Sequence, residues 1–263
     1  MRIVLLQIHP TPTDATAAIS QAEQLMQQTP EADLYVLPEM WATGFIPTPR
    51  PAMHQESMRA LEWMKRTATS TGHAVAGSLA VMENADLSAT KNADKDDMIH
   101  NDTGDMSVWR NRFFFVHPEG TICHYDKRHL FSPAGENRSF RAGQCRVTVD
   151  YKGVRFLLQT CFDLRFPESS RNGLNEPYDV ALFTASWPKE RRLAWHTLLQ
   201  ARAIENQAFT IGVNGMGGSA AFGPLGDVLA EPLEGCMQRH TIEISTDDFK
   251  RMEEIRRSFP VLE

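Results

Sequence analysis

The sequence has no long apolar run and no excess of positive charge. Nowhere in its 263 residues does it approach the roughly 20 consecutive apolar residues that a membrane-spanning helix needs. The formal net charge of −6 argues against a nucleic-acid partner, because phosphate binding requires a basic face. No small-residue cleavage site follows the apolar segment Met1–Gln7, so we expect a first strand there and not a signal peptide. Neither a membrane nor a nucleic acid is an expected partner.

Cysteine is also scarce. Cys123, Cys145, Cys161 and Cys236 are widely separated and form no C-x-x-C pair. This spacing fits neither a zinc site nor a disulfide framework in a domain of this size. We therefore expect no metal site and a reducing, cytoplasmic location. Hydrophobic residues make up 42% of the chain, a share typical of globular domains that are stabilised by an ordinary core.

Short apolar runs alternate with segments of helical period over most of the chain. Apolar residues repeat at three- and four-residue spacing from Ala15 to Met26, which predicts an amphipathic helix that Thr13 or Asp14 can cap. The same reasoning predicts helices near 58–68, 193–204 and 247–258, and strands near 2–8, 33–37, 73–82, 178–185, 209–213 and 227–230.

Two hairpins are expected in the middle of the chain. Residues 108–125 turn at Pro118-Glu119-Gly120, and residues 147–159 turn at Tyr151-Lys152-Gly153. Helices that alternate with strands at both ends, with hairpins between them, favour an α/β sandwich with mixed sheets inside and helices outside. Because no repeat or linker interrupts the pattern, we expect one domain over residues 1–263. The polar stretch 83–105 is expected to be a surface insertion, with a lid over a pocket as the alternative.

Three chemically complementary side chains each follow a predicted strand. They are Glu39 after Pro38, Lys127 in a basic turn, and Cys161 at the start of a polar segment. Sites in α/β proteins usually lie at the carboxyl ends of strands, and these residues would supply a base, a cation and a soft nucleophile. Taken singly, each has a plain structural explanation: an exposed loop glutamate, a solvated turn and a packed thiol.

The segments around these residues resemble the nitrilase superfamily, the carbon–nitrogen hydrolases, over nearly the whole chain. The matching motifs occur in the family's order: LPEM at 37–40, YDKRHLF at 125–131, CFDLRFPE at 161–168, ASWP at 185–188 and ARAIENQ at 201–207. The resemblance implies a four-layer αββα sandwich and a homodimer or larger assembly. It also implies catalysis without a metal or an organic cofactor, with a small amide and water as the reactants.

The resemblance assigns roles to individual residues. It makes Glu39 the general base, Lys127 the cation that stabilises the oxyanion, and Cys161 the nucleophile. Glu136 matches a second family glutamate that helps to position substrate and supports the lysine. The backbone N–H of Phe162 is expected to donate to the oxyanion hole. The side chain of Trp187 is expected to line the pocket.

Within the superfamily, the omega-amidase branch is the most similar. WATGF at 41–45 and SPAGE at 132–136 carry this likeness. That branch removes the terminal amide of 2-oxoglutaramate and 2-oxosuccinamate. The chain departs from the family pattern in its longer insertion at 83–105 and in the shortened loop after Asn214, where no arginine follows. Because that loop borders the pocket in relatives, the substrate remains open.

Several alternatives share these residues. A nitrilase, a carbamoylase or another aliphatic amidase would use the same three catalytic groups. A non-catalytic binding protein on the same fold is a different class, although such a protein would be free to lose them. A Cys–His hydrolase would instead need His129 or His196 beside the thiol.

Overall fold

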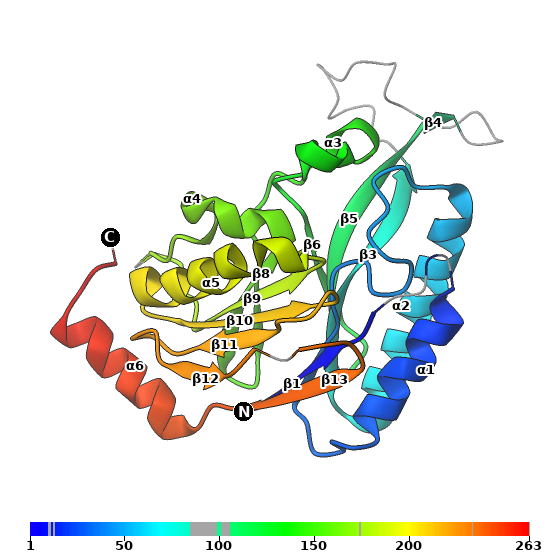
Figure 1. Ribbon diagram of the computed structural model, residues 1–263. Helices are drawn as coiled ribbons and strands as arrows, with labels where there is room; N and C mark the ends of the chain where they lie inside the picture. Colours follow the sequence, from blue (N-terminus) through cyan, green and yellow to red (C-terminus); the bar gives the residue numbers. More distant parts are fainter. Residues whose placement is uncertain are drawn as a thin grey trace.

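The computed structural model of the protein (Figure 1) describes residues 1–9, 12, 14–84, 99–100, 106–173, 175–232 and 234–262. Most of the predicted insertion at 83–105 therefore lies outside the described residues, as does Thr13. None of the described helices combines the length and the apolar character that crossing a membrane requires.

The described strands form two mixed sheets. The first sheet has the order β13-β1-β2-β3-β5-β4, with β6 paired to β5, and the second has the order β12-β11-β10-β9-β8-β7. The strands of the first sheet are β1 (Arg2–Gln7), β2 (Leu34–Val36), β3 (Ala74–Asn84), β4 (Ile99–His100), β5 (Met106–Val116), β6 (Ile122–Asp126) and β13 (Gln238–Glu243). Those of the second are β7 (Thr148–Tyr151), β8 (Val154–Thr160), β9 (Val180–Ala185), β10 (Phe209–Asn214), β11 (Ala220–Phe222) and β12 (Val228–Ala230).

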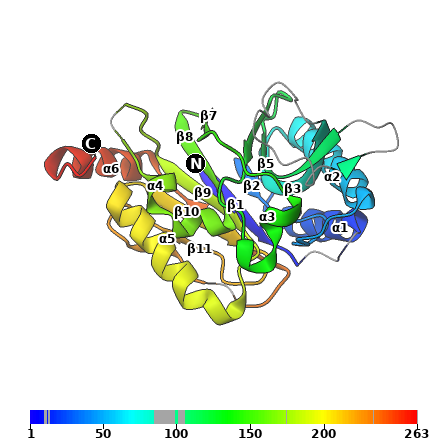
Figure 2. The same ribbon diagram turned by 90° about the horizontal axis from the view of Figure 1, so that it is seen from above.

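Helices cover the outer face of each sheet. Figure 2 shows α1 and α2 outside the first sheet and α4 and α5 outside the second, while α6 projects from one end. The two sheets pack face to face through one apolar core that includes Val36 and Phe115 from the first and Phe156, Leu182 and Ile211 from the second. The helices are α1 (Ala15–Met26), α2 (Pro51–Thr71), α3 (Glu136–Ser139), α4 (Pro167–Ser170), α5 (Arg192–Asn206) and α6 (Thr246–Ser258). The predicted αββα sandwich is confirmed.

Local sequence signals account for most of these elements. The strands β2 and β9 are buried at every position, as expected for apolar runs covered on both faces. Both predicted hairpins form, as the antiparallel pairs β5–β6 and β7–β8. The helix α1 begins at Asp14, whose carboxylate accepts hydrogen bonds from the backbone N–H groups of Thr16 and Ala17 at 3.0 and 3.3 Å.

The structure differs from the prediction in several elements. The strands β4, β11 and β13 and the short helices α3 and α4 were not predicted. The strand β11 is short, and β13 (QRHTIE) is largely polar because it lies at a sheet edge. The helix α5 was predicted from a stripe that includes Leu193 and Ile204, but these two side chains face outward and are 82% and 50% exposed. The face of α5 that packs on the sheet carries Trp195 and Leu199 instead.

The loop after β2 lies directly against β3. The backbone N–H of Leu37 donates to the carbonyl of Ala76 at 2.8 Å, and that of Met40 donates to the Ser78 hydroxyl at 3.0 Å. A Cβ at Gly77 would lie 2.8 Å from the Leu37 Cβ. Only glycine therefore permits this approach, which fixes the backbone on both sides of Glu39.

Replacing Gly77 with alanine should destabilise the protein by about 1–3 kcal/mol, because the added methyl group overpacks a backbone contact that cannot move freely. Urea unfolding followed by circular dichroism would measure the loss. An unchanged unfolding midpoint would mean that the loop can retreat from β3 without cost.

Candidate active site

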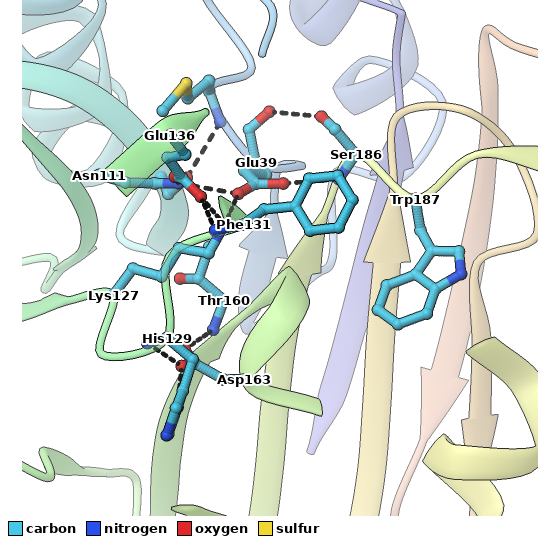
Figure 3. Close-up of polar contacts among 12 residues, drawn as sticks. Glu39, Asn111, Lys127, His129, Phe131, Glu136, Thr160, Asp163, Ser186 and Trp187 are labelled. Atoms are coloured by element: carbon cyan, nitrogen blue, oxygen red, sulfur yellow. Dashed lines mark hydrogen bonds and ion pairs between the residues drawn. The ribbon is translucent and has the colours of Figure 1, made fainter. Parts of the chain in front are cut away.

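Three predicted residues follow strands that end on the same side of the sandwich. Glu39 follows β2, Lys127 follows β6 and Cys161 follows β8. Glu136, at the start of α3, joins them (Figure 3). Residues far apart in the sequence therefore meet where the carboxyl ends of strands from both sheets lie together.

A buried ion cluster occupies the centre of the site. The Lys127 Nζ lies 2.8 Å from Glu39 Oε1 and 2.8 Å from Glu136 Oε2, and all three side chains are fully buried. Burial alone would lower the pKa of Lys127. The carboxylates of Glu136 and Glu39 outweigh burial and hold this pKa well above its ordinary value. The lysine therefore remains a cation.

Asn111 on β5 bridges the two glutamates and was not predicted. Its Nδ2 group donates to Glu39 Oε1 at 2.8 Å and to Glu136 Oε1 at 3.0 Å, while its Oδ1 accepts from the Ser78 hydroxyl at 3.0 Å. The sequence did contain a signal for a buried polar role of Asn111. The two-residue period of a strand places Asn111 on the same face as the apolar Trp109 and Phe113, and a polar side chain on a buried apolar face needs hydrogen-bond partners.

The second sheet supplies the remaining contacts of Glu39. The backbone N–H of Ser186, just after β9, donates to Glu39 Oε2 at 2.9 Å, and the Ser186 hydroxyl donates to the Glu39 carbonyl at 3.2 Å. The Glu39 carboxylate is thus held from both sheets. Its charge also acts on the neighbouring Cys161 thiol, whose pKa it raises.

Cys161 begins a short 3₁₀ helix, Cys161–Arg165, directly after β8. Its φ angle of 46° lies in the left-handed region, which costs a residue with a Cβ some energy and is typical of an exposed nucleophile on a sharp turn. Burial and the neighbouring Glu39 carboxylate raise the pKa of the Cys161 thiol well above its ordinary value, although Lys127 acts in the opposite direction. The resting thiol is therefore neutral.

Asp163 anchors this turn. Its Oδ2 accepts hydrogen bonds from the Thr160 backbone N–H at 2.9 Å and from the Tyr125 hydroxyl at 2.7 Å, and its Oδ1 accepts from the His129 backbone N–H at 2.9 Å. The His129 ring also contacts Asp163 and stacks on Phe166. Figure 3 shows His129 and Asp163 together, apart from the cluster around Lys127.

Neither candidate histidine is arranged as a base for the thiol. His129 Nδ1 lies 2.9 Å from Asp163 Oδ1, and His196 Nε2 lies 2.9 Å from the Gly218 carbonyl oxygen. Neither lines the pocket that contains Cys161. The arrangement favours Glu39 as the base over a Cys–His pair.

A pocket of about 430 Å³ opens onto the thiol. Glu39, Cys161, Phe162 and Trp187 line it, whereas Lys127 and Glu136 are not part of the lining. Most other lining side chains are apolar, among them Phe45, Ile46, Phe131 and Met216. Among the described residues, no group of three or more His, Cys, Asp or Glu side chains could hold a metal ion.

The loop after Asn214, which is expected from the sequence to depart from the family pattern, reaches the pocket through Gly215 and Met216. Asn214 fixes its start. The Asn214 Oδ1 accepts from the Trp187 backbone N–H at 2.8 Å, and its Nδ2 donates to the Trp187 carbonyl at 2.9 Å. This loop and the Trp187 segment are therefore positioned together.

Comparison with known proteins agrees with this geometry. Residues 2–256 match the family model for carbon–nitrogen hydrolases. The chain is 34% identical to the omega-amidase YafV of Yersinia enterocolitica, over 97% of this chain and 93% of that protein. It is 32% identical to a 2-oxoglutaramate amidase of Bacillus subtilis, over 93% of this chain and 90% of that one.

A solved structure supports the same assignment. A CN-hydrolase superfamily protein of Xanthomonas campestris, with an arsenic adduct in its active site, is 30% identical and superposes with a TM-score of 0.80, covering 99% of this chain and 95% of that one. The fold, the full-length sequence match and the clustered glutamate, lysine and cysteine agree, and the chain belongs to the carbon–nitrogen hydrolase family, also known as the nitrilase superfamily.

Proposed function

We propose that this protein is an omega-amidase, which hydrolyses the terminal amide of small keto acid amides such as 2-oxoglutaramate and 2-oxosuccinamate to the acid and ammonia. The observation that carries the proposal is that Glu39 and Cys161 line one pocket while Lys127 binds the Glu39 carboxylate at 2.8 Å. The activities named for the similar proteins of Y. enterocolitica and B. subtilis support the choice of substrate.

In the first half of the reaction, Glu39 accepts the Cys161 thiol proton as the sulfur attacks the amide carbonyl carbon. A neutral thiol needs this base, because the thiolate is the nucleophile. Two of the three N–H donors of Lys127 bind Glu39 and Glu136, which leaves one for the oxyanion. The Phe162 backbone N–H is the second donor, and each well-placed donor contributes about 3–4 kcal/mol.

In the second half, Glu39 passes its proton to the departing ammonia, and a thioester remains on Cys161. Glu39 then accepts a proton from water as the water oxygen attacks the thioester carbonyl. Breaking the carbon–sulfur bond releases the acid, and the sulfur takes the proton back from Glu39. These steps use side chains, a backbone amide and water.

In this mechanism Glu136 positions Lys127. Its Oε2 accepts hydrogen bonds from the Lys127 ammonium at 2.8 Å and from the Phe131 backbone N–H at 2.6 Å. It is fully buried behind the lysine, so it holds the cation in place without lining the pocket. Trp187 shapes the pocket wall.

Cys161→Ala should abolish ammonia release from 2-oxoglutaramate while leaving the folded structure intact. Glu39→Gln and Lys127→Met should each lower kcat by several powers of ten, because residues that act as a unit fail together. A coupled ammonia assay would measure the loss, and thermal unfolding would report on the fold. Nitriles assayed in parallel would separate an amidase from a nitrilase.

Cys145→Ala is the matched control, because Cys145 is a free, exposed thiol that does not line the pocket. This variant should keep the wild-type rate. Turnover of keto acid amides by Cys161→Ala at the wild-type rate would contradict the proposal.

Asn111→Leu should lower kcat by roughly ten- to a hundredfold, because Glu39 and Glu136 would each lose a donor that holds their carboxylates in place. The measurement is kcat and KM for 2-oxoglutaramate, with thermal unfolding as the readout of the fold. A wild-type kcat in a folded Asn111→Leu variant would show that the bridge has no part in catalysis.

We also infer that the protein forms a homodimer or a larger homo-oligomer. Apolar side chains are exposed on the outer face of α5 and on the adjacent loop: Leu193 and Leu225 are 82% and 56% exposed, and Ile204 lies against Gly226. Large exposed apolar side chains are typical of an interface between subunits.

Leu193→Glu combined with Ile204→Glu should convert the assembly to monomers, because the interface would have to bury two carboxylates. Light scattering coupled to size exclusion would measure the mass against the 29.7 kDa of one chain. Met58→Glu is the control, since Met58 is also exposed but lies on α2, in the opposite outer layer. A wild-type mass of one chain would contradict the inference.

We place the enzyme in the cytoplasm. All four cysteines are free thiols, and Cys145 and Cys236 are exposed. Exposed thiols stay reduced in a reducing compartment and are prone to oxidation elsewhere.

A further inference from the structure

Two arginines line the pocket together with Cys161. Arg165 ends the 3₁₀ helix that Cys161 begins, and Arg191 ends the 3₁₀ helix Lys189–Arg191 that precedes α5. Glu39 is the one acidic residue of the described lining, and its carboxylate already binds Lys127. The two arginines therefore give the pocket lining positive charge that no free lining carboxylate compensates.

Both guanidinium groups are held against aromatic faces. The Cζ of Arg165 lies 5.0 Å from the centre of the Trp187 ring, and the Cζ of Arg191 lies 5.0 Å from the centre of the Phe131 ring. Trp187 also fixes the Arg191 backbone, because its Nε1–H donates to the Arg191 carbonyl at 2.9 Å. Trp187 and Phe131 are drawn in Figure 3 on the side of the Glu39 carboxylate away from Asn111.

Neither arginine has a carboxylate partner among the residues that the structure describes. By contrast, two nearby arginines of α5 do have carboxylate partners: Arg192 is paired with Glu234, and Arg202 with Glu205. Stacking on an aromatic face occupies the plane of a guanidinium group and leaves its N–H donors at the edge. Those donors suit the two oxygens of a carboxylate.

We propose that Arg165 and Arg191 bind the free carboxylate of the substrate while its amide lies at Cys161. This inference rests on the proposed amidase function and deepens it by assigning the residues that select the substrate. Much of the remaining pocket lining is apolar, including Phe45, Ile46 and Met216, and suits a short aliphatic chain. The enzyme then prefers monoamides of short dicarboxylic acids over neutral amides of equal length.

Arg191 is the better residue to replace. Arg165 shares a 3₁₀ helix with the nucleophile, so its loss would also disturb Cys161, whereas Arg191 lies on a separate element. Lys189→Gln is the matched control. It removes one positive charge from the same short helix, but Lys189 is exposed and does not line the pocket.

The test compares 4-carbamoylbutanoate with pentanamide, which has the same number of carbon atoms and no carboxylate. In Arg191→Gln, KM for 4-carbamoylbutanoate should rise roughly ten- to a hundredfold, as expected for the loss of a charge-assisted hydrogen bond. Its kcat should change by only a few-fold. The kcat/KM ratio of the carboxylate amide to pentanamide should fall by about the same factor. Arg191→Lys should restore part of the preference, and Lys189→Gln should keep the wild-type ratio.

The outcomes separate this inference from the function on which it rests. An equal loss on both amides, or an unchanged ratio in Arg191→Gln, would overturn the carboxylate assignment. So would a wild-type enzyme that hydrolyses pentanamide as well as 4-carbamoylbutanoate, although the amidase function would stand. A wild-type enzyme that releases ammonia from neither of these amides nor 2-oxoglutaramate would overturn the proposed function itself.

Discussion

The site depends on one buried cation shared by two buried carboxylates. Lys127, Glu39 and Glu136 are completely enclosed, and removing such groups from water costs several kcal/mol for each charge. Close geometry offsets this cost. The ammonium lies 2.8 Å from each carboxylate, and the carboxylates take further hydrogen bonds from Asn111 and from the Ser186 and Phe131 backbones. These donors come from both sheets and from the loops after them, so the cluster requires the complete sandwich.

The same cluster determines the protonation state of Cys161, the proposed nucleophile. A carboxylate beside a partly buried thiol disfavours the thiolate, and the pKa of Cys161 is raised although a lysine is near. Glu39 is therefore both the reason that the resting thiol is neutral and the group able to take its proton. The turn that carries the thiol is held independently, by Asp163 and its contacts to Thr160 and Tyr125. Glu39 thus controls the protonation of the Cys161 thiol, and Asp163 controls its position.

Asn214 links two parts of the pocket wall. It holds Trp187, and the loop that begins immediately after it contributes Gly215 and Met216 to the lining. A change in this loop therefore alters the shape of the pocket without touching Glu39, Lys127 or Asp163. Chemistry and substrate choice can vary separately in such an arrangement.

Local signals in the sequence predicted most of the strands and both hairpins, because buried apolar runs and turn residues can be recognised without the fold. The sequence also placed Glu39, Lys127 and Cys161 just after strands, and the family motifs around them indicated one site. It did not reveal that Asn111 joins Glu39 to Glu136, or that β13 pairs with β1, because these contacts link residues distant along the chain. The outward stripe of α5 was likewise ambiguous, since a helix with apolar residues on two faces does not say which one packs on the sheet. Only the tertiary structure decided these points, because each depends on which surfaces the folded sheets bring together.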